Sequence, residues 1–338
     1  MVNEYELMKF GIFDHVDRGD EPLHNFYETR LRLVEKYEEE GFYAYHTAEH
    51  HATSLGMASS PSVFMSAVAQ RTERLKFGPL VYCLPQYHPI RLFEEICMLD
   101  QMSKGRFQLG VGKGISALES QYFGLDTDKV SSIYREYFQI LIKAMTVDEL
   151  TFEGEHFSVE RMPIEMQPLQ EPHPPIWSGI GLPGSTRWPA ENRINTMSNA
   201  NSKIVRKITD AYRKEWDGFG YDPDELPLLG MTRFVVIAET DEKALILGRR
   251  MYDVWYKSFM KLWWLHDKTP PQAACTETFD GMISDGKAVA GTADTVKNML
   301  DENIDQSGVN YLLCRFAFGD VKYEEAAYSI DAFSEMYL

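Results

Sequence analysis

The chain has 338 residues, of which 44% are hydrophobic and 25% charged, and its formal net charge is −17 at pH 7. This composition is ordinary for a globular protein, and the strong acidity argues against a nucleic-acid partner. No apolar run is long enough to cross a bilayer, and the acidic N-terminus has no apolar signal core. The four cysteines are far apart without a C-x-x-C pair, so we expect reduced thiols in a cytoplasmic protein.

The first half of the chain alternates apolar strand patterns with amphipathic helical patterns. We predict strands at 8–15, 42–47, 75–84 and 107–111, separated by a helix ending at Glu40 and by helices at 61–71 and 88–104. Proline begins the second and third of these helices, and Lys104-Gly105 ends the third. Such strand–helix–strand units normally join parallel strands through a right-handed crossover.

The second half continues the alternation after a predicted hairpin insertion at about 149–170. We predict strands at 174–181, 194–198, 228–238 and 309–316, and helices at 131–146, 202–219, 241–264, 292–300 and 323–337. Residues 265–286 lack clear periodicity and hold two prolines and two glycines, so we expect a mobile lid there. About eight alternating strands favour a single-domain (β/α)₈ TIM barrel with insertions over an open doubly wound sheet.

The active site of such a barrel lies where the strands end, so polar residues at strand ends are the candidates. These are His15, Glu49, His50, His51 and the turns at 112–114 and 181–187. The corresponding stretch of the third strand, Leu80-Val81-Tyr82, is apolar and would form a wall.

Three polar residues in a row, Glu49-His50-His51, are unusual at one strand end. A histidine suits general acid–base chemistry because its pKa lies near neutrality. A solvated loop is the simpler alternative. His46-x-x-Glu49-His50 also matches an inverted zinc-protease pattern, but that pattern needs a helix, and residues 42–47 are typical of a strand.

Two glycine-rich turns are candidates for holding a phosphate. Gly112-Lys113-Gly114 lacks the earlier glycine of a Walker loop and by itself indicates only a turn. The second turn, Gly181 to Thr186, precedes a predicted helix whose free backbone N–H groups would favour an anion. An ordinary helix N-cap is the alternative there.

A family resemblance is carried by one long ordered run from Leu84 to Gly114. Leu-Pro at a strand end, His-Pro-x-Arg at a helix start, Leu-Asp-Gln-Met-Ser-Lys-Gly-Arg-Phe at its exit and Gly-x-Gly-Lys-Gly together resemble the bacterial luciferase-like flavin monooxygenases. The resemblance covers most of the chain and is strongest from 8 to 125. Gly112 stands where luciferase has a reactive cysteine.

The resemblance implies a (β/α)₈ enzyme that uses reduced FMN and O₂ to oxygenate a small organic substrate, with a separate flavin reductase. It implies that His50 is catalytic and that Glu49 lies near the flavin ring. The cofactor-binding residues that it implies are Glu49, Leu80, Val81, Lys113, Gly181, Gly184, Ser185 and Thr186, with Lys113 and the 181–186 turn at the phosphate. It also implies a homodimer through the helices at 61–71 and 88–104.

Three alternatives remain at the level of sequence. A deazaflavin-dependent oxidoreductase of the same superfamily would transfer hydride, and a non-catalytic flavoprotein would only store or sense flavin. A metallopeptidase would use the His46–His50 pattern. We find no nicotinamide-binding fingerprint, because the one G-x-G run, Gly110-Val111-Gly112, lacks the third glycine and the acidic partner.

Overall fold

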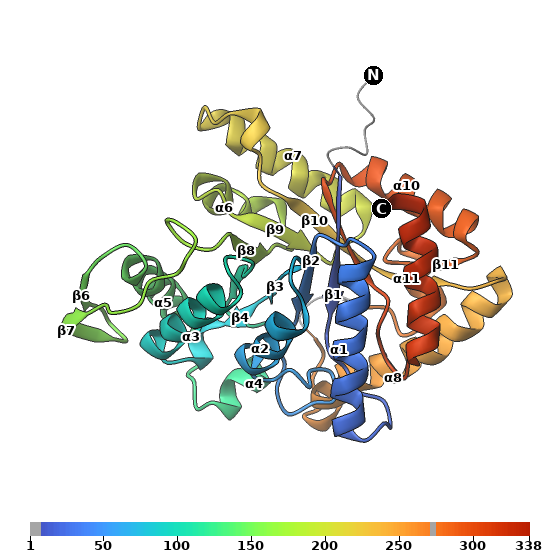
Figure 1. Cartoon of the computed structure of the whole chain (residues 1–338), viewed down its shortest axis with the longest axis horizontal. Helices are drawn as coiled ribbons and strands as arrows, with labels where there is room; N and C mark the ends of the chain where they lie inside the picture. Colours follow the sequence, from blue (N-terminus) through green and yellow to red (C-terminus); the bar gives the residue numbers. More distant parts are fainter. Residues whose placement is uncertain (1–7, 271–274) are drawn as a thin grey trace.

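A computed structural model describes residues 8–270 and 275–338 of the chain (Figure 1). Its main sheet contains ten parallel strands: β1 (Lys9–Asp14), β2 (Ala44–Thr47), β3 (Lys76–Pro79), β4 (Tyr82–Cys83), β5 (Leu109–Gly112), β8 (Ile176–Gly179), β9 (Asn195–Ser198), β10 (Leu229–Ile237), β11 (Ala288–Gly291) and β12 (Tyr311–Arg315). The strand order is β3-β2-β1-β12-β10-β9-β8-β5-β4, with β11 paired to β10 outside this path.

The sheet closes into a barrel where β3 meets the start of β5. Phe77 and Phe107 form a parallel bridge, and the Gln108 N–H donates to the Phe77 carbonyl at 2.8 Å. Further along, β4 pairs with β5 through Tyr82 and Val111. Because β3 and β4 share one place in the ring and β11 lies off it, the ring has the eight places of a TIM barrel, which confirms the predicted fold class.

Helices surround the barrel, as Figure 1 shows. They are α1 (Leu23–Glu39), α2 (Pro61–Arg71), α3 (Pro89–Met102), α4 (Ala117–Tyr122), α5 (Val130–Ala144), α6 (Arg187–Glu191), α7 (Ser202–Gly218), α8 (Asp241–Leu265), α9 (Phe279–Ser284), α10 (Ala293–Ser307) and α11 (Tyr323–Tyr337). None of the described helices combines the length and the apolar character needed to cross a bilayer. All four cysteines are free.

Alternation along the strands divides the core into an outer layer and a barrel interior. On β12, Leu312 and Cys314 join the large cluster beneath the helices, whereas Tyr311 and Leu313 pack inside the barrel. All five residues of β12 are buried, because the strand is covered on both faces. By the same alternation, Arg315 at the C-terminal end of β12 belongs to the inner face.

Several local predictions need correction. The strand predicted at 75–84 is divided into β3 and β4, and Leu84 begins a short 3₁₀ helix, Leu84–Gln86. The peptide bond between Leu80 and Val81, in the gap between the two strands, is cis. The strand β11 and the helix α4 were not predicted. The helix predicted to end at Leu300 continues to Ser307 and stops at Gly308, whose φ of 65° is left-handed.

The two predicted insertions are only partly regular. At 149–170 the strands β6 (Glu149–Glu153) and β7 (Ser158–Pro163) pair antiparallel, and they project from the barrel at the left of Figure 1. In the segment 265–286, residues 271–274 lie outside the described part of the chain. The rest of that segment contains α9, whose Phe279 and Met282 are buried, and this helix was not predicted.

Candidate active site

The predicted site residues do follow strand ends of the barrel. His15 comes directly after β1, the Glu49–His51 run follows β2, and Lys113 follows β5. Because the ring strands are parallel, these residues lie at the same face of the barrel, which we call the mouth. The 181–186 turn follows β8, and β8 pairs with β5, so Lys113 and this turn follow neighbouring strands.

His50 is held by a carboxylate that sequence reasoning did not select. Its Nδ1 lies 3.1 Å from Oε1 of Glu119, and the other oxygen of Glu119 accepts the backbone N–H of His51 at 3.0 Å. Glu119 lies on α4, whose first turn is capped by Ser116. With Nδ1 donating to this carboxylate, Nε2 of His50 is left as a proton acceptor.

Glu49 connects the loop after β2 to the strand β4. One carboxylate oxygen contacts Nε2 of His51 at 2.9 Å, and the other accepts the backbone N–H of Cys83 at 2.9 Å. The side chain is buried. Both oxygens of Glu49 therefore have protein partners, which fix the course of the loop that carries His50.

His15 lies beside His50, with ring centroids 5.8 Å apart and planes stacked at 26°. Its Nδ1 accepts the indole N–H of Trp255 at 3.4 Å, so its own proton resides on Nε2. Burial, followed by the charges of Arg315, His50 and Arg30, lowers the pKa of His15 well below its usual value. His15 is thus a neutral imidazole at neutral pH.

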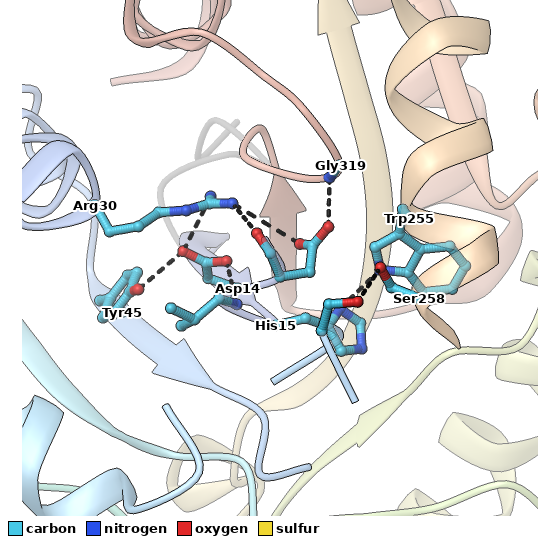
Figure 2. A network of polar contacts seen from close by, with 10 residues as sticks. Asp14, His15, Arg30, Tyr45, Trp255, Ser258 and Gly319 are labelled. Carbon is cyan, nitrogen blue, oxygen red and sulfur yellow. Dashed lines mark hydrogen bonds and ion pairs between the residues drawn. The ribbon is translucent and has the colours of Figure 1, made fainter. Parts of the chain in front are cut away.

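The loop after β2 is also attached to helix α8. Thr53 donates its hydroxyl to the carbonyl of Ser258 at 2.6 Å, and the hydroxyls of Ser54 and Ser258 are 3.0 Å apart. Figure 2 shows Trp255 and Ser258 on α8 facing His15. Helix α8 therefore forms one side of the mouth, next to the two histidines.

A small cavity of about 20 Å³, partly open to solvent, lies between this loop, α4 and α8. Its lining is mainly apolar, and it includes His50 and Glu119 at one end. The lining residues are His50, Thr53, Leu55, Ile115, Ser116, Glu119, Phe259, Leu262, Trp263 and Pro270. A cavity of this size holds about one water-sized group, and its apolar lining favours an apolar group next to the histidine.

Leu80 and Val81, predicted as a wall, do line the interior near the mouth. Leu80 belongs to the buried cluster inside the barrel, and the half-buried Val81 packs against it. A Cβ at Gly112 would lie 2.4 Å from Val81 Cγ2, so the absent side chain at Gly112 makes this close approach possible.

The predicted phosphate region is open and basic. Lys113 is exposed and has no ion pair within the described ranges 8–270 and 275–338. A Cβ at Gly179 or Gly184 would meet nothing within 4 Å, so there is room above this edge of the mouth. The residues therefore fit an anionic tail.

Two details of that turn could not be read from the sequence. Thr186 donates its hydroxyl to the carbonyl of Pro183 at 2.9 Å, which removes it as a donor. The predicted helix begins with the 3₁₀ turn Pro183–Ser185 and continues only as the five residues of α6. Exposed Gly181 and Ser185 border the same space.

The zinc-protease pattern has no counterpart in the folded chain. His46 lies on β2 inside the barrel, packed 5.0 Å from the ring of Trp177, and burial lowers its pKa to about 3. Across 8–270 and 275–338, no three His, Cys, Asp or Glu side chains are arranged to hold a metal ion.

Two curated relatives match nearly the whole chain. The uncharacterized protein y4wF of Sinorhizobium fredii is 41% identical over 324 residues, covering 95% of this chain and 94% of its own length. The oxygenase component of the flavin-dependent trigonelline monooxygenase of Acinetobacter baylyi is 24% identical over 331 residues, covering 96% of this chain and 89% of its own.

Solved structures share the fold over almost the entire length. The monooxygenase RslO1 of Streptomyces bottropensis has a TM-score of 0.87 at 24% identity, covering 98% of both chains. The oxygenating constituent of 3,6-diketocamphane monooxygenase of Pseudomonas putida, solved with FMN, has a TM-score of 0.81 at 19% identity and covers 98% of both.

The same fold also occurs in a coenzyme F420 dependent tetrahydromethanopterin reductase of Methanopyrus kandleri. Its TM-score is 0.69 at 18% identity, covering 98% of this chain and 99% of that one. The fold alone therefore does not distinguish a flavin from a deazaflavin.

The family model for luciferase-like monooxygenases matches residues 8–311. The chain, with its closed barrel and its histidine-bearing mouth, therefore belongs to the luciferase-like monooxygenase family.

Proposed function

We propose that this chain is the oxygenase of a two-component system, which uses reduced FMN and O₂ to oxygenate a small apolar organic substrate. The observation that carries the proposal is the pair formed by His50 and Glu119 at the end of an apolar pocket. Among the similar proteins, the trigonelline monooxygenase is described as flavin-dependent, and the 3,6-diketocamphane monooxygenase was solved with FMN. Both descriptions support the choice of cofactor. When bound, reduced flavin would supply the electrons that activate O₂.

The chain's own residues would bind and orient that cofactor. Lys113 and the 181–186 turn, with Gly181, Gly184 and Ser185 around an open space, are proposed to hold the phosphate. Thr186 would contribute its backbone N–H rather than its hydroxyl. Glu49, Leu80 and Val81 are proposed to lie along the ring system, the last two as an apolar wall that excludes water.

His50 is proposed to handle the proton. Glu119 holds its Nδ1, so Nε2 can accept a proton from a group in the pocket and later return it. The apolar side chains around it, including Phe259 and Trp263, would keep bulk water away during the reaction.

Three further proposals come from the sequence. A separate reductase would supply the reduced flavin, in line with the name of the trigonelline monooxygenase relative, which is an oxygenase component. The chain would form a homodimer through α2 and α3, where Val63 is 72% exposed. It would act in the cytoplasm.

Oxygen consumption with photoreduced FMN across a panel of aldehydes, ketones and alkanes tests the function. We expect substrate-dependent product formation in the unmodified chain. His50→Ala should lower turnover by about 10²–10⁴-fold, as is typical for loss of an acid–base residue, while FMN affinity stays nearly unchanged. His24→Ala, a change at an exposed histidine of α1, is the matched control and should have no effect.

A deazaflavin-dependent hydride transfer is the second candidate, because an F420-dependent reductase shares the fold. If reduced deazaflavin reduces a substrate and reduced FMN gives no oxygen uptake, the chain is a deazaflavin-dependent oxidoreductase and not an oxygenase. Flavin binding without any turnover over the whole panel would indicate a storage or sensing protein.

A further inference from the structure

Arg315 is a buried cation at the mouth of the barrel, and neither the sequence motifs nor the proposed mechanism uses it. It is the last residue of β12, faces the interior and is in register with Phe234 on β10, and it also packs against Phe13 on β1. Its guanidinium carbon lies 4.7 Å from the ring centroids of both phenylalanines. The residue is only 5% exposed.

The hydrogen bonds of Arg315 are made to neutral groups. Nη2 donates to Oδ1 of Asn199 at 2.6 Å and to the hydroxyl of Thr232 at 3.0 Å. Nε is buried and has no hydrogen-bond partner. No carboxylate of the described ranges forms an ion pair with Arg315 within 4.0 Å. We call Arg315, Asn199 and Thr232 the Arg315 cluster.

A second buried arginine has a hydrogen-bond partner for every guanidinium nitrogen. Arg233, on β10, also forms no ion pair with a carboxylate of the described residues, but all three of its guanidinium nitrogens donate hydrogen bonds. Its partners are Asn303, Ser202 and the carbonyls of Ala200 and Thr232. Arg233 is thus a structural crosslink, whereas Arg315 keeps an unused donor.

The charge of Arg315 is also poorly balanced at longer range. The groups that act on its charge are, in order, Cys275, Tyr252 and Asp17, and burial outweighs them, lowering the pKa of Arg315 to about 10. Asp17 is already shared with Arg30 and the N–H of Gly319. Arg315 is therefore still a cation at neutral pH, in a place where an unpaired charge is costly.

The position of Arg315 in the ring suggests what its ligand is. Between β12 and β5 lie β10, β9 and β8 on one side of the ring, and β1, β2 and β3 on the other. Arg315 therefore lies across the mouth from Lys113, which follows β5. A ligand with its anionic tail at Lys113 that extends over the mouth would bring its other end toward the Arg315 cluster.

We propose that Arg315 is the cationic residue of an anion-binding subsite at the mouth, and that its ligand is the negatively charged ring of reduced FMN. The inference rests on the proposed function. A fixed positive charge favours the anionic reduced ring over the neutral oxidised one, so it biases the cofactor toward the reduced form. In this role Arg315 determines which redox state of the flavin the oxygenase retains.

The test is to measure dissociation constants of oxidised and, anaerobically, reduced FMN for the unmodified chain and for Arg315→Gln. We expect Arg315→Gln to weaken binding of reduced FMN by about 10- to 100-fold, the range for one charge-assisted hydrogen bond, and binding of oxidised FMN by less than about 3-fold. Arg315→Lys, which keeps the charge, should recover most of the preference.

Two other variants separate this role from a structural one. Arg233→Gln removes a buried arginine of the same kind and should change both affinities by the same factor. Asn199→Asp would place a carboxylate against Nη2 of Arg315, so it should raise the melting temperature by balancing the charge and also abolish the preference for reduced FMN. This variant keeps the test decisive if Arg315→Gln does not fold.

Equal losses for the two redox forms in Arg315→Gln, or an unchanged preference in Asn199→Asp, would overturn the subsite while leaving FMN binding intact. Failure of the unmodified chain to bind FMN in either form would overturn the proposed function, and the subsite with it.

Discussion

Arg30 and Arg315 are both buried near the end of β1, and they differ in what balances their charge. Arg30, on α1, lies 3.5 Å from Oδ2 of Asp14 and 3.9 Å from Oδ1 of Asp17, and it donates to the carbonyl of Asp17 at 2.9 Å. Tyr45 donates to Asp14 at 2.9 Å, and Gly319 donates to Asp17. We call Arg30, Asp14, Asp17, Tyr45 and Gly319 the Arg30 clamp, and Figure 2 labels all of its members except Asp17.

The two arrangements serve different purposes. In the Arg30 clamp two carboxylates surround one guanidinium, and their hydrogen bonds fix the chain that leads into His15. In the Arg315 cluster the guanidinium has only neutral partners and an unused Nε. A buried charge whose counter-charges are in place indicates a structural role. A buried charge that lacks them and faces the mouth indicates a binding site for a charged ligand.

The largest effect on stability should come from removing the cation of the Arg30 clamp. Arg30→Met would leave Asp14 and Asp17 buried without their partner, so we expect a loss of about 3–5 kcal/mol in the free energy of unfolding. Denaturant titration measures this loss. Arg32→Met, at an exposed arginine of the same helix, should cost less than about 1 kcal/mol. Comparable losses in the two variants would mean that the clamp does not carry the stability assigned to it.

The clamp should also make stability depend on pH through Asp17. Burial, opposed by Arg30 and reinforced by Asp14, raises the pKa of Asp17 from 3.8 to about 7. Between these values the native state keeps a proton that the unfolded chain releases, so this contribution is complete below about pH 4 and is lost as the pH approaches 7. Its size is on the order of 2–4 kcal/mol.

Asp17→Asn should therefore flatten the decline of the melting temperature between pH 4 and 7. The change should leave the preference for reduced FMN in place, because Asp17 makes no hydrogen bond to Arg315 and is the weakest of the three groups that act on its charge. Asp20→Asn, at an exposed aspartate, is the control and should keep the decline of the unmodified chain. An unchanged slope in Asp17→Asn would show that another group titrates.

A smaller effect is expected at Glu119, a carboxylate whose partner is a histidine instead of an arginine. Glu119→Gln should lower kcat by about 10-fold through loss of orientation at His50, with KM and FMN affinity nearly unchanged. Glu119→Asp should restore part of the rate. A loss confined to KM would assign Glu119 to substrate binding and not to positioning.

The sequence was sufficient for the barrel and for the location of its mouth. Apolar strands alternate with helices over the whole chain, and the polar residues after β1, β2 and β5 stand out against apolar strands. Two short elements were missed: α4 has only six residues, too few to establish a helical period, and β11 follows the segment 265–286, which has no clear periodicity. Glu119 was missed with α4.

Arg315 was missed although its strand was predicted at 309–316. Both faces of β12 are apolar, so alternation along the sequence does not reveal which face is the interior. The rule applied to the first two strands, that a polar residue at a strand end is a site candidate, would have selected Arg315 if it had been applied to the last strand. Its neutral partners, Asn199 directly after β9 and Thr232 on β10, could not be assigned without the fold.

The central claim, that the mouth binds reduced FMN, is tested most directly by anaerobic titration with reduced FMN and, separately, with reduced deazaflavin coenzyme. We predict saturable binding of one FMN per chain, weakened in Lys113→Ala by about 1–3 kcal/mol through loss of a charge-assisted contact to the phosphate. The deazaflavin should not displace it. Saturable binding of the deazaflavin, with none of reduced FMN, would contradict the account.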